Sequence, residues 1–132
     1  MKHILVAATV ALALAAVSCN NAEKAQIEKF RGTEAYALML AVEQQDTARI
    51  QAIAQHQLYV INIRNLKDGE TAISVAVQLE KYDSFKALLN SGADPNLSGF
   101  TKGTSAADYA DKLARQGDRR FSDAINKMNQ MH

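Results

Sequence analysis

Residues 68–96, with the sequence DGETAISVAVQLEKYDSFKALLNSGADPN, decide the fold of this chain. Asp68-Gly69 is a turn pair, because glycine adopts positive φ values without a steric penalty. Thr71 is suited to cap a first helix, and a second helix can begin near Asp83. Gly92 fits the left-handed position that commonly follows a helix. The stretch therefore predicts a hairpin of two short helices, too small to bury both of its faces alone.

The hairpin pattern repeats along the chain. Residues 69–76, GETAISVA, and residues 103–110, GTSAADYA, share the order glycine, any residue, hydroxyl, alanine, apolar, polar, apolar, alanine. Toward the N-terminus, Ala41-Val42 precedes Ile50 by the same spacing that separates Ala76-Val77 from Phe85. A period of 34 to 35 residues built from helix pairs is typical of a solenoid, in which each repeat buries its core against its neighbours.

The central copy, GETAISVAV followed by KALLNSGADPN, resembles the ankyrin repeat. The usual wording of that family is G-x-T-P-L-H-x-A-A and then V-x-x-L-L-x-x-G-A-D-x-N. The copy before it has Glu34 at the opening glycine, and the copy after it has Ser105 for the threonine. In the central copy, Ala72 and Ser74 stand where the family has proline and histidine.

The resemblance covers about residues 33–126 and implies an all-α ankyrin-repeat solenoid of about three helix-turn-helix repeats. The implied repeats are residues 33–62, 63–96 and 97–128, and residues 129–132 form a polar tail. Within the first repeat, LYVINI at residues 58–63 has the composition of a β-strand. Because its position matches the loop after a second helix, we expect an extended connection instead.

Residues 1–18 have the features of an export signal. A basic start is followed by an uncharged run over residues 4–17, too short to span a bilayer, which needs about 20 apolar residues. The only cysteine, Cys19, follows Ala16-Val17-Ser18, which resembles the bacterial lipobox with Ala16 in place of the usual leucine. We therefore expect a lipoprotein signal peptide and a lipid on Cys19, with an ordinary signal peptide as the alternative.

The resemblance to sorted lipoproteins implies a location in the bacterial cell envelope. Asn20 follows the cysteine where inner-membrane retention signals have aspartate, which favours the outer membrane with the domain facing the periplasm. Residues 19–32 are mostly polar, and we expect a flexible or weakly helical tether. Ile27 and Phe30 are spaced for one helix face, so packing against the first repeat is the alternative.

The charge balance gives no reason to expect nucleic acid as a partner. The whole chain has 15 basic and 14 acidic side chains, and removal of the signal takes away Lys2, which leaves equal numbers. Nucleic-acid binding depends on an excess of Lys and Arg against phosphates. Arg115, Arg119 and Arg120 cluster late in the chain, but aspartates are interleaved with them, which is typical of a solvated helix face.

No set of residues in the sequence predicts catalysis or a cofactor. There is no G-x-S-x-G, no phosphate-binding glycine loop and no H-E-x-x-H. His56 lies between two glutamines and is expected on the surface, because a metal site needs several convergent ligands. Asp108 and Asp111 share one helix face at i, i+3, which is far more often solvated than cation-binding. We therefore expect neither an enzyme, a cofactor nor a metal site.

The resemblance to ankyrin stacks implies that the chain binds proteins through its hairpin tips and the concave face formed by the first helices. The residues that this implies as partner-binding are Glu43, Gln44, Lys67, Asp68, Glu70, Gln78, Phe100, Thr101, Lys102, Thr104 and Lys112. Phe100 lies in the loop Ser-Gly-Phe-Thr-Lys-Gly. It is either tucked under the helices, which is the position we expect, or exposed as an anchor for a partner.

The sequence thus predicts a monomeric protein-binding ankyrin module, attached to the envelope membrane only through its lipid. Two finer roles stay open beside simple binding. One is an immunity or inhibitor lipoprotein that neutralises a toxic, envelope-active enzyme. The other is a stress-protective scaffold for an envelope complex. An enzyme with an unrecognised site is the third class, and the identity of the protein partner cannot be read from the residues.

Overall fold

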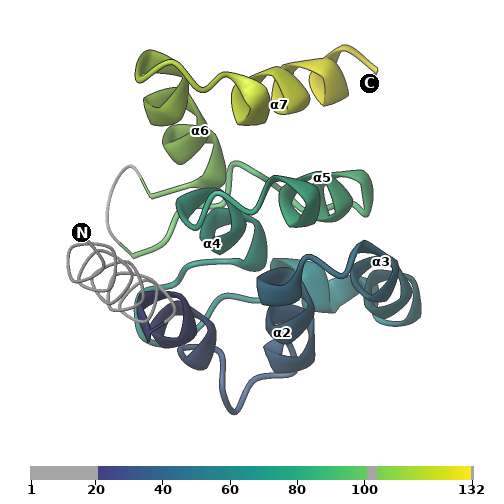
Figure 1. Ribbon diagram of the computed structural model, residues 1–132. Helices are drawn as coiled ribbons and strands as arrows, with labels where there is room; N and C mark the ends of the chain where they lie inside the picture. Colours follow the sequence, from purple (N-terminus) through teal and green to yellow (C-terminus); the bar gives the residue numbers. More distant parts are fainter. Residues whose placement is uncertain (1–20, 101–103, 132) are drawn as a thin grey trace, which may run out of the picture.

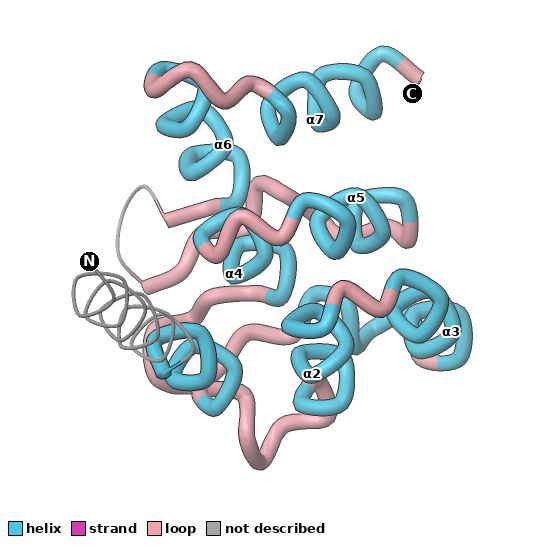
Figure 2. Tube along the Cα trace, viewed as in Figure 1, coloured by secondary structure: helices cyan, strands magenta, loops and turns pink. Residues whose placement is uncertain are grey.

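A computed structural model describes residues 21–100 and 104–131, and within these ranges every regular element is a helix (Figures 1 and 2). Residues 21–28 are helical and precede the repeats. The elements that follow are α2 (Tyr36–Gln44), α3 (Thr47–His56), the 3-10 helix η1 (Leu58–Asn62), α4 (Ala72–Gln78), α5 (Tyr82–Asn90), α6 (Ala106–Arg115) and α7 (Arg120–Gln130). The predicted all-α solenoid of three helix pairs is confirmed.

The helix pairs stack in two rows. The first helices of the three hairpins, α2, α4 and α6, pack in succession, and the second helices, α3, α5 and α7, form the row beside them (Figure 1). Each predicted repeat range contains one such pair, and α7 continues to Gln130, two residues beyond the predicted end of the third repeat. The two rows place all three hairpins in one continuous core.

Gly69 and Gly92 form the turns that were expected from them, and Thr71 precedes α4 as expected, although its own hydroxyl has no hydrogen-bond partner among the described residues. Asp46 caps α3, where its side chain accepts a hydrogen bond from the Arg49 N–H at 3.1 Å. Gly69 and Gly92 have φ values of +74° and +100°, the left-handed region that other residues rarely enter. Thr71 is the residue before α4, and its backbone N–H donates to Ser74 Oγ at 3.0 Å.

Residues 58–63 differ from the extended connection that we expected. They form the 3-10 helix η1, in which the N–H of Val60 donates to the carbonyl of Gln57 at 3.1 Å. This tight turn points Val60 and Ile61 into the core, where both are buried. Burial of two β-branched side chains therefore explains the strand-like composition without a strand.

The segment before the first repeat is not the tether that we expected. Ile27 and Phe30 are fully buried and belong to the same apolar core as the repeats. The Lys29 ammonium forms an ion pair with Asp68 Oδ2 at 2.8 Å in the second repeat. The expectation of an unpacked spacer is therefore wrong for residues 21–32, because two apolar side chains on one helix face found a place in the core.

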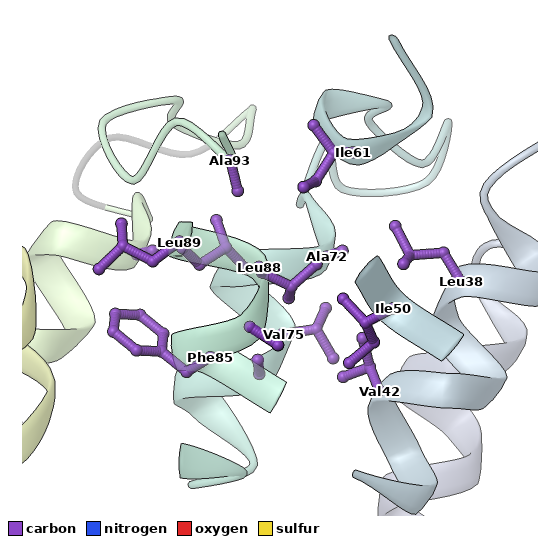
Figure 3. Packing of buried hydrophobic residues seen from close by; sticks show 14 of the residues in the cluster. Leu38, Val42, Ile50, Ile61, Ala72, Val75, Phe85, Leu88, Leu89 and Ala93 are labelled. Atoms are coloured by element: carbon purple, nitrogen blue, oxygen red, sulfur yellow. The ribbon is translucent and has the colours of Figure 1, made fainter. Parts of the chain in front are cut away.

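The core is centred on α4. Residues 72–77 are all buried, so this short helix has no exposed face over six consecutive positions. Figure 3 shows side chains of α4 and α5, such as Val75 and Phe85, on one side, with Val42 and Ile50 of the first repeat approaching from the other. The alanines at 72 and 76 let the neighbouring backbones come close. Among the helix pairs that the structure describes, the second repeat is therefore the one with a packed neighbour repeat on each side.

The third repeat is fixed to the second by aromatic packing. Phe121 near the start of α7 is fully buried and meets Phe85 edge-on, with the ring centroids 5.0 Å apart. It also meets Tyr82 in a T-shaped contact at 5.4 Å. Aromatic pairs of this geometry stabilise beyond the area that they bury. Phe121 is thus the main apolar link from α7 to α5.

Hydrogen bonds also cross the repeat boundaries. Between the first and second repeats, the Ser84 hydroxyl donates to the carbonyl of Val42 at 2.7 Å, and the Asp94 N–H donates to Asn62 Oδ1 at 3.0 Å. Ser84 is buried, so its bond also satisfies a polar group inside the core.

Between the second and third repeats the link is a buried carboxylate. Glu70 is only 5% exposed; its Oε2 accepts from the Ser74 hydroxyl, and its Oε1 accepts from the Tyr109 hydroxyl at 3.2 Å. Burial raises the pKa of the Glu70 carboxyl above its usual value, although both hydroxyls oppose the shift. Burial and the nearby Glu70 charge raise the pKa of Tyr109 to about 12. Glu70 thus occupies a position where its charged form is disfavoured.

We expect Phe121→Ala to lower the free energy of unfolding by about 3–5 kcal/mol, because it removes a fully buried ring and leaves a cavity. Urea unfolding followed by circular dichroism measures this loss. Phe100→Ala makes the same chemical change at an exposed ring and should cost less than about 1 kcal/mol. Equal costs for the two variants would contradict the packing described for α7.

We expect Glu70→Gln to flatten the dependence of stability on pH. A raised folded-state pKa means that the carboxyl stabilises the fold fully below its unfolded pKa, and that this contribution is lost as pH rises through the folded-state value. The amide can still donate to Ser74 Oγ while the Ser74 hydroxyl donates to the Thr71 carbonyl, which lies 2.9 Å away.

Urea unfolding at pH 4.5, 6 and 8 tests the role of Glu70. The wild type should lose stability from the lowest to the highest pH more steeply than Glu70→Gln does. Glu43→Gln, the same change on the surface of α2, should follow the wild type. A Glu70→Gln variant with the wild-type pH dependence would contradict a folded-state pKa of Glu70 that burial has raised.

Candidate protein-binding surface

The tip of the second repeat is built around Asn65, a residue that the sequence analysis did not select. Asn65 is fully buried, and its Oδ1 accepts from the N–H groups of Lys67 and Asp68, each at 2.9 Å. Its Nδ2 donates to Asp68 Oδ1 at 2.7 Å. Asparagine commonly closes turns by bonding to the backbone two residues onward. The tip is therefore a structured turn that can present side chains in fixed positions.

Lys67 and Asp68, two charged residues of this tip, differ in how far they are exposed to a partner. Lys67 is exposed, whereas Asp68 is half-buried and already paired with Lys29. Partial burial alone would raise the pKa of Asp68, but hydrogen bonds from Lys29, the Glu70 N–H and Asn65 hold it below its usual value. Asp68 therefore serves the internal structure of the tip, and Lys67 faces outward.

Phe100 lies on the same tip and is not tucked under the helices as we expected. Its side chain is 67% exposed, while its N–H donates to the Asp68 carbonyl at 2.9 Å. The ring rests against Gly69 so closely that a Cβ at position 69 would lie 2.7 Å from Phe100 Cδ1. Gly69 thus provides both the positive φ of the turn and the flat surface that supports the ring.

Glu70 is the clearest departure from the predicted set. We expected it to contact a partner at the tip, but it is buried and bonded to Ser74 and Tyr109. Thr104 is half-buried, and its Oγ1 accepts from the Gly99 N–H at 2.7 Å. Both residues hold neighbouring loops together and present little surface to a partner.

The structure brings Gln78 and Lys112 together on the first-helix row. They line a shallow hollow of about 300 Å³ between α4 and α6, which we call the inner hollow. Its lining residues are Val77, Gln78, Tyr109, Lys112, Leu113 and Gln116. Within the described ranges, Gln78 Nε2 is buried and has no hydrogen-bond partner. Leaving a buried donor unpaired costs free energy.

The remaining predicted residues are not joined to these features. Glu43 is half-buried and Gln44 is exposed at the end of α2, and neither lines the inner hollow. Thr101, Lys102 and Cys19 lie outside the residues that the structure describes.

Sequence reasoning missed the most exposed apolar residue of the tip. Leu66 is 86% exposed and precedes Lys67 in the same turn as Gly69, on which Phe100 rests. The sequence did contain a signal for the exposure of Leu66, because an apolar residue inside a polar turn sequence has no neighbour in that turn to bury it. We define the tip surface as Leu66, Lys67 and Phe100. Exposed apolar side chains that gather in one place commonly mark interaction sites.

Metal sites and membrane spans are two further features that the described part of the chain could contain. Among those residues, no group of three or more His, Cys, Asp or Glu is arranged to hold a metal ion. In the same ranges, no helix has the length and apolar character needed to cross a membrane.

Comparison with known proteins identifies the repeats. A family model described as ankyrin repeats, in three copies, matches residues 5–98. The match begins within the predicted signal peptide and ends before α6, although α6 and α7 form the third helix pair. Neither the search of curated proteins nor the search of solved structures found a match. The chain belongs to the ankyrin-repeat family, whose members typically bind other proteins rather than act as enzymes.

Proposed function

We propose that the protein binds a protein partner through the tip surface, with the inner hollow as a second point of contact. The observation that carries this proposal is the pair of exposed apolar side chains, Leu66 and Phe100, on a tip whose backbone is fixed by Asn65. Binding hot spots are commonly a few large anchors held in place before the partner arrives. Lys67 beside them adds a charge that favours an acidic partner surface.

The inner hollow complements the tip. It offers Lys112 as an exposed cation at its rim, and its wall includes Gln78, whose Nε2 is buried without a hydrogen-bond partner among the described residues. Polar groups of this kind fix the orientation of a bound segment more than they add affinity. A partner that covered the tip and reached the hollow would contact the second and third repeats together.

We further propose that the domain is held at the bacterial envelope by a lipid on Cys19, and the sequence around that cysteine supports this. The first described helical residue, Asn21, follows Cys19 by two positions. Two residues span at most about 7 Å, so the folded domain would lie close to the membrane surface. Such a position restricts partners to proteins of the envelope or to proteins that arrive there.

The partner would decide between the finer roles. Capture of a toxic enzyme active in the envelope would favour an immunity or inhibitor function. Capture of a resident envelope protein would favour a protective scaffold.

We expect Leu66→Ser combined with Phe100→Ser to abolish capture of the partner, because the substitutions remove both apolar anchors. The full chain is purified from envelope extract under mild detergent, and the retained proteins are quantified by mass spectrometry. The matched control is Leu58→Ser with Tyr59→Ser, which removes one aliphatic and one aromatic exposed side chain from η1. A partner lost equally from both variants, or from neither, would overturn the tip surface as the binding site.

We expect the envelope form of the protein to begin at Cys19 and to carry acyl chains, which an intact mass measurement detects. Cys19→Ser should remove the acyl mass and accumulate unprocessed chain. An unmodified Cys19, or a mature chain that begins elsewhere, would contradict the lipid anchor and would leave the tip-surface proposal standing.

A further inference from the structure

A second hollow lies on the other side of the molecule from the first-helix row. It is about 570 Å³ in volume and lies between α5 and α7 of the second-helix row, and we call it the outer groove. Figure 2 shows α7 running beside α5 at this end of the stack. None of its lining residues belongs to the tip surface or to the inner hollow.

The outer groove exists because the packing between α5 and α7 is uneven. At the start of α7, Phe121 fills the space against Tyr82 and Phe85. One turn later the residue facing the groove is Ala124, whose methyl group leaves room that the ring does not reach.

The lining of the groove is apolar at its base and flexible on one wall. Leu89 of α5 is nearly fully buried, Ala124 and Met128 of α7 are half-buried, and Met131 is 69% exposed. Methionine side chains adapt to irregular shapes and are common on surfaces that bind varied segments. The groove therefore offers an apolar base that can adjust to an inserted side chain.

The rim of the groove has an excess of positive charge. Arg120 is balanced by Asp118, with the guanidinium and carboxylate 2.9 Å apart. Lys86 on α5 and Lys127 on α7 are exposed, and neither forms an ion pair with any residue that the structure describes. Asp123 at the rim is next to Arg119 at 3.9 Å. Lys86 lies over the Tyr82 ring, 5.6 Å from its centroid, and has no carboxylate partner. Two lysines without a described carboxylate partner thus face the groove from opposite walls.

We propose that the outer groove binds an acidic segment of a partner protein that inserts apolar side chains between α5 and α7. The positive charges of Lys86 and Lys127 favour a segment that has a carboxylate on each side of its apolar residues. The apolar base of the groove accepts those residues, such as Leu, Ile or Met. Of the apolar lining only Met131 is largely exposed, whereas Leu89 and Ala124 lie inside the hollow, where an inserted side chain reaches them better than a flat membrane surface does. The site is separate from the tip surface, so one protein can bind two segments.

Selection of random 12-residue peptides displayed on phage, with the full chain as bait in mild detergent, tests this inference. We expect enriched peptides to combine Glu or Asp with apolar residues. Fluorescein-labelled copies should bind the variant Lys86→Glu with Lys127→Glu at least ~10-fold more weakly than the wild type, as measured by fluorescence polarisation. Ala124→Phe, which fills the hollow without changing charge, should also abolish binding.

The matched control is Lys24→Glu with Arg49→Glu, two exposed residues outside the groove, the tip surface and the inner hollow, which makes the same change in net charge and should bind as the wild type does. The tip variant Phe100→Ser should also bind the peptides as the wild type does. Peptide binding to the groove is therefore tested independently of the tip-surface proposal. Enrichment of no peptide, enrichment without acidic residues, or equal weakening by the control would overturn the inference. Cosedimentation with phosphatidylglycerol vesicles that is lost only in Lys86→Glu with Lys127→Glu would assign the groove to a membrane and would also overturn it.

Discussion

The burial of α4 between α2 and α6 is the contact on which the rest of the structure depends. A seven-residue helix with six consecutive buried positions cannot be stable alone, because isolated helices of this length are marginal in water. Neighbours on both sides supply the missing apolar surface, and the alanines of α4 allow them to approach. The second repeat is therefore stabilised by its position in the stack, and the first and third repeats are stabilised by it.

The two candidate binding surfaces follow from this arrangement. The row of first helices ends in tips, and the Asn65 turn with Gly69 fixes one tip firmly enough to support an exposed Phe100 ring. The row of second helices packs less evenly, and Ala124 leaves the outer groove. A small solenoid thus has exposed apolar side chains at one tip and a hollow between α5 and α7 of its other row.

Most of the fold could be predicted from the sequence, because its signals are local. Gly69 and Gly92 set turns through their own backbone preferences, and the 34-residue offset revealed the repeats. Packing over long distances could not be predicted in this way. Ile27 and Phe30 look like isolated apolar residues in a polar segment, and only the shape of the distant core shows that both fit.

The site was less predictable than the fold, for the same reason. Glu70 occupies a tip position in the repeat pattern, but its burial depends on Tyr109 from the next repeat. Phe100 is exposed because the Gly69 backbone and the Asp68 carbonyl hold its loop outward. Both outcomes depend on contacts between residues more than 30 positions apart, which no local pattern encodes.

Photocrosslinking in living cells tests the central claim most directly. A benzophenone side chain at position 100 should crosslink to one protein partner, because it would replace the exposed ring at the tip surface. The same group at position 58, on the exposed side of η1, should not capture that partner. Crosslinking from position 58 and none from position 100 would contradict the account, because the binding face would then lie on the other side of the stack.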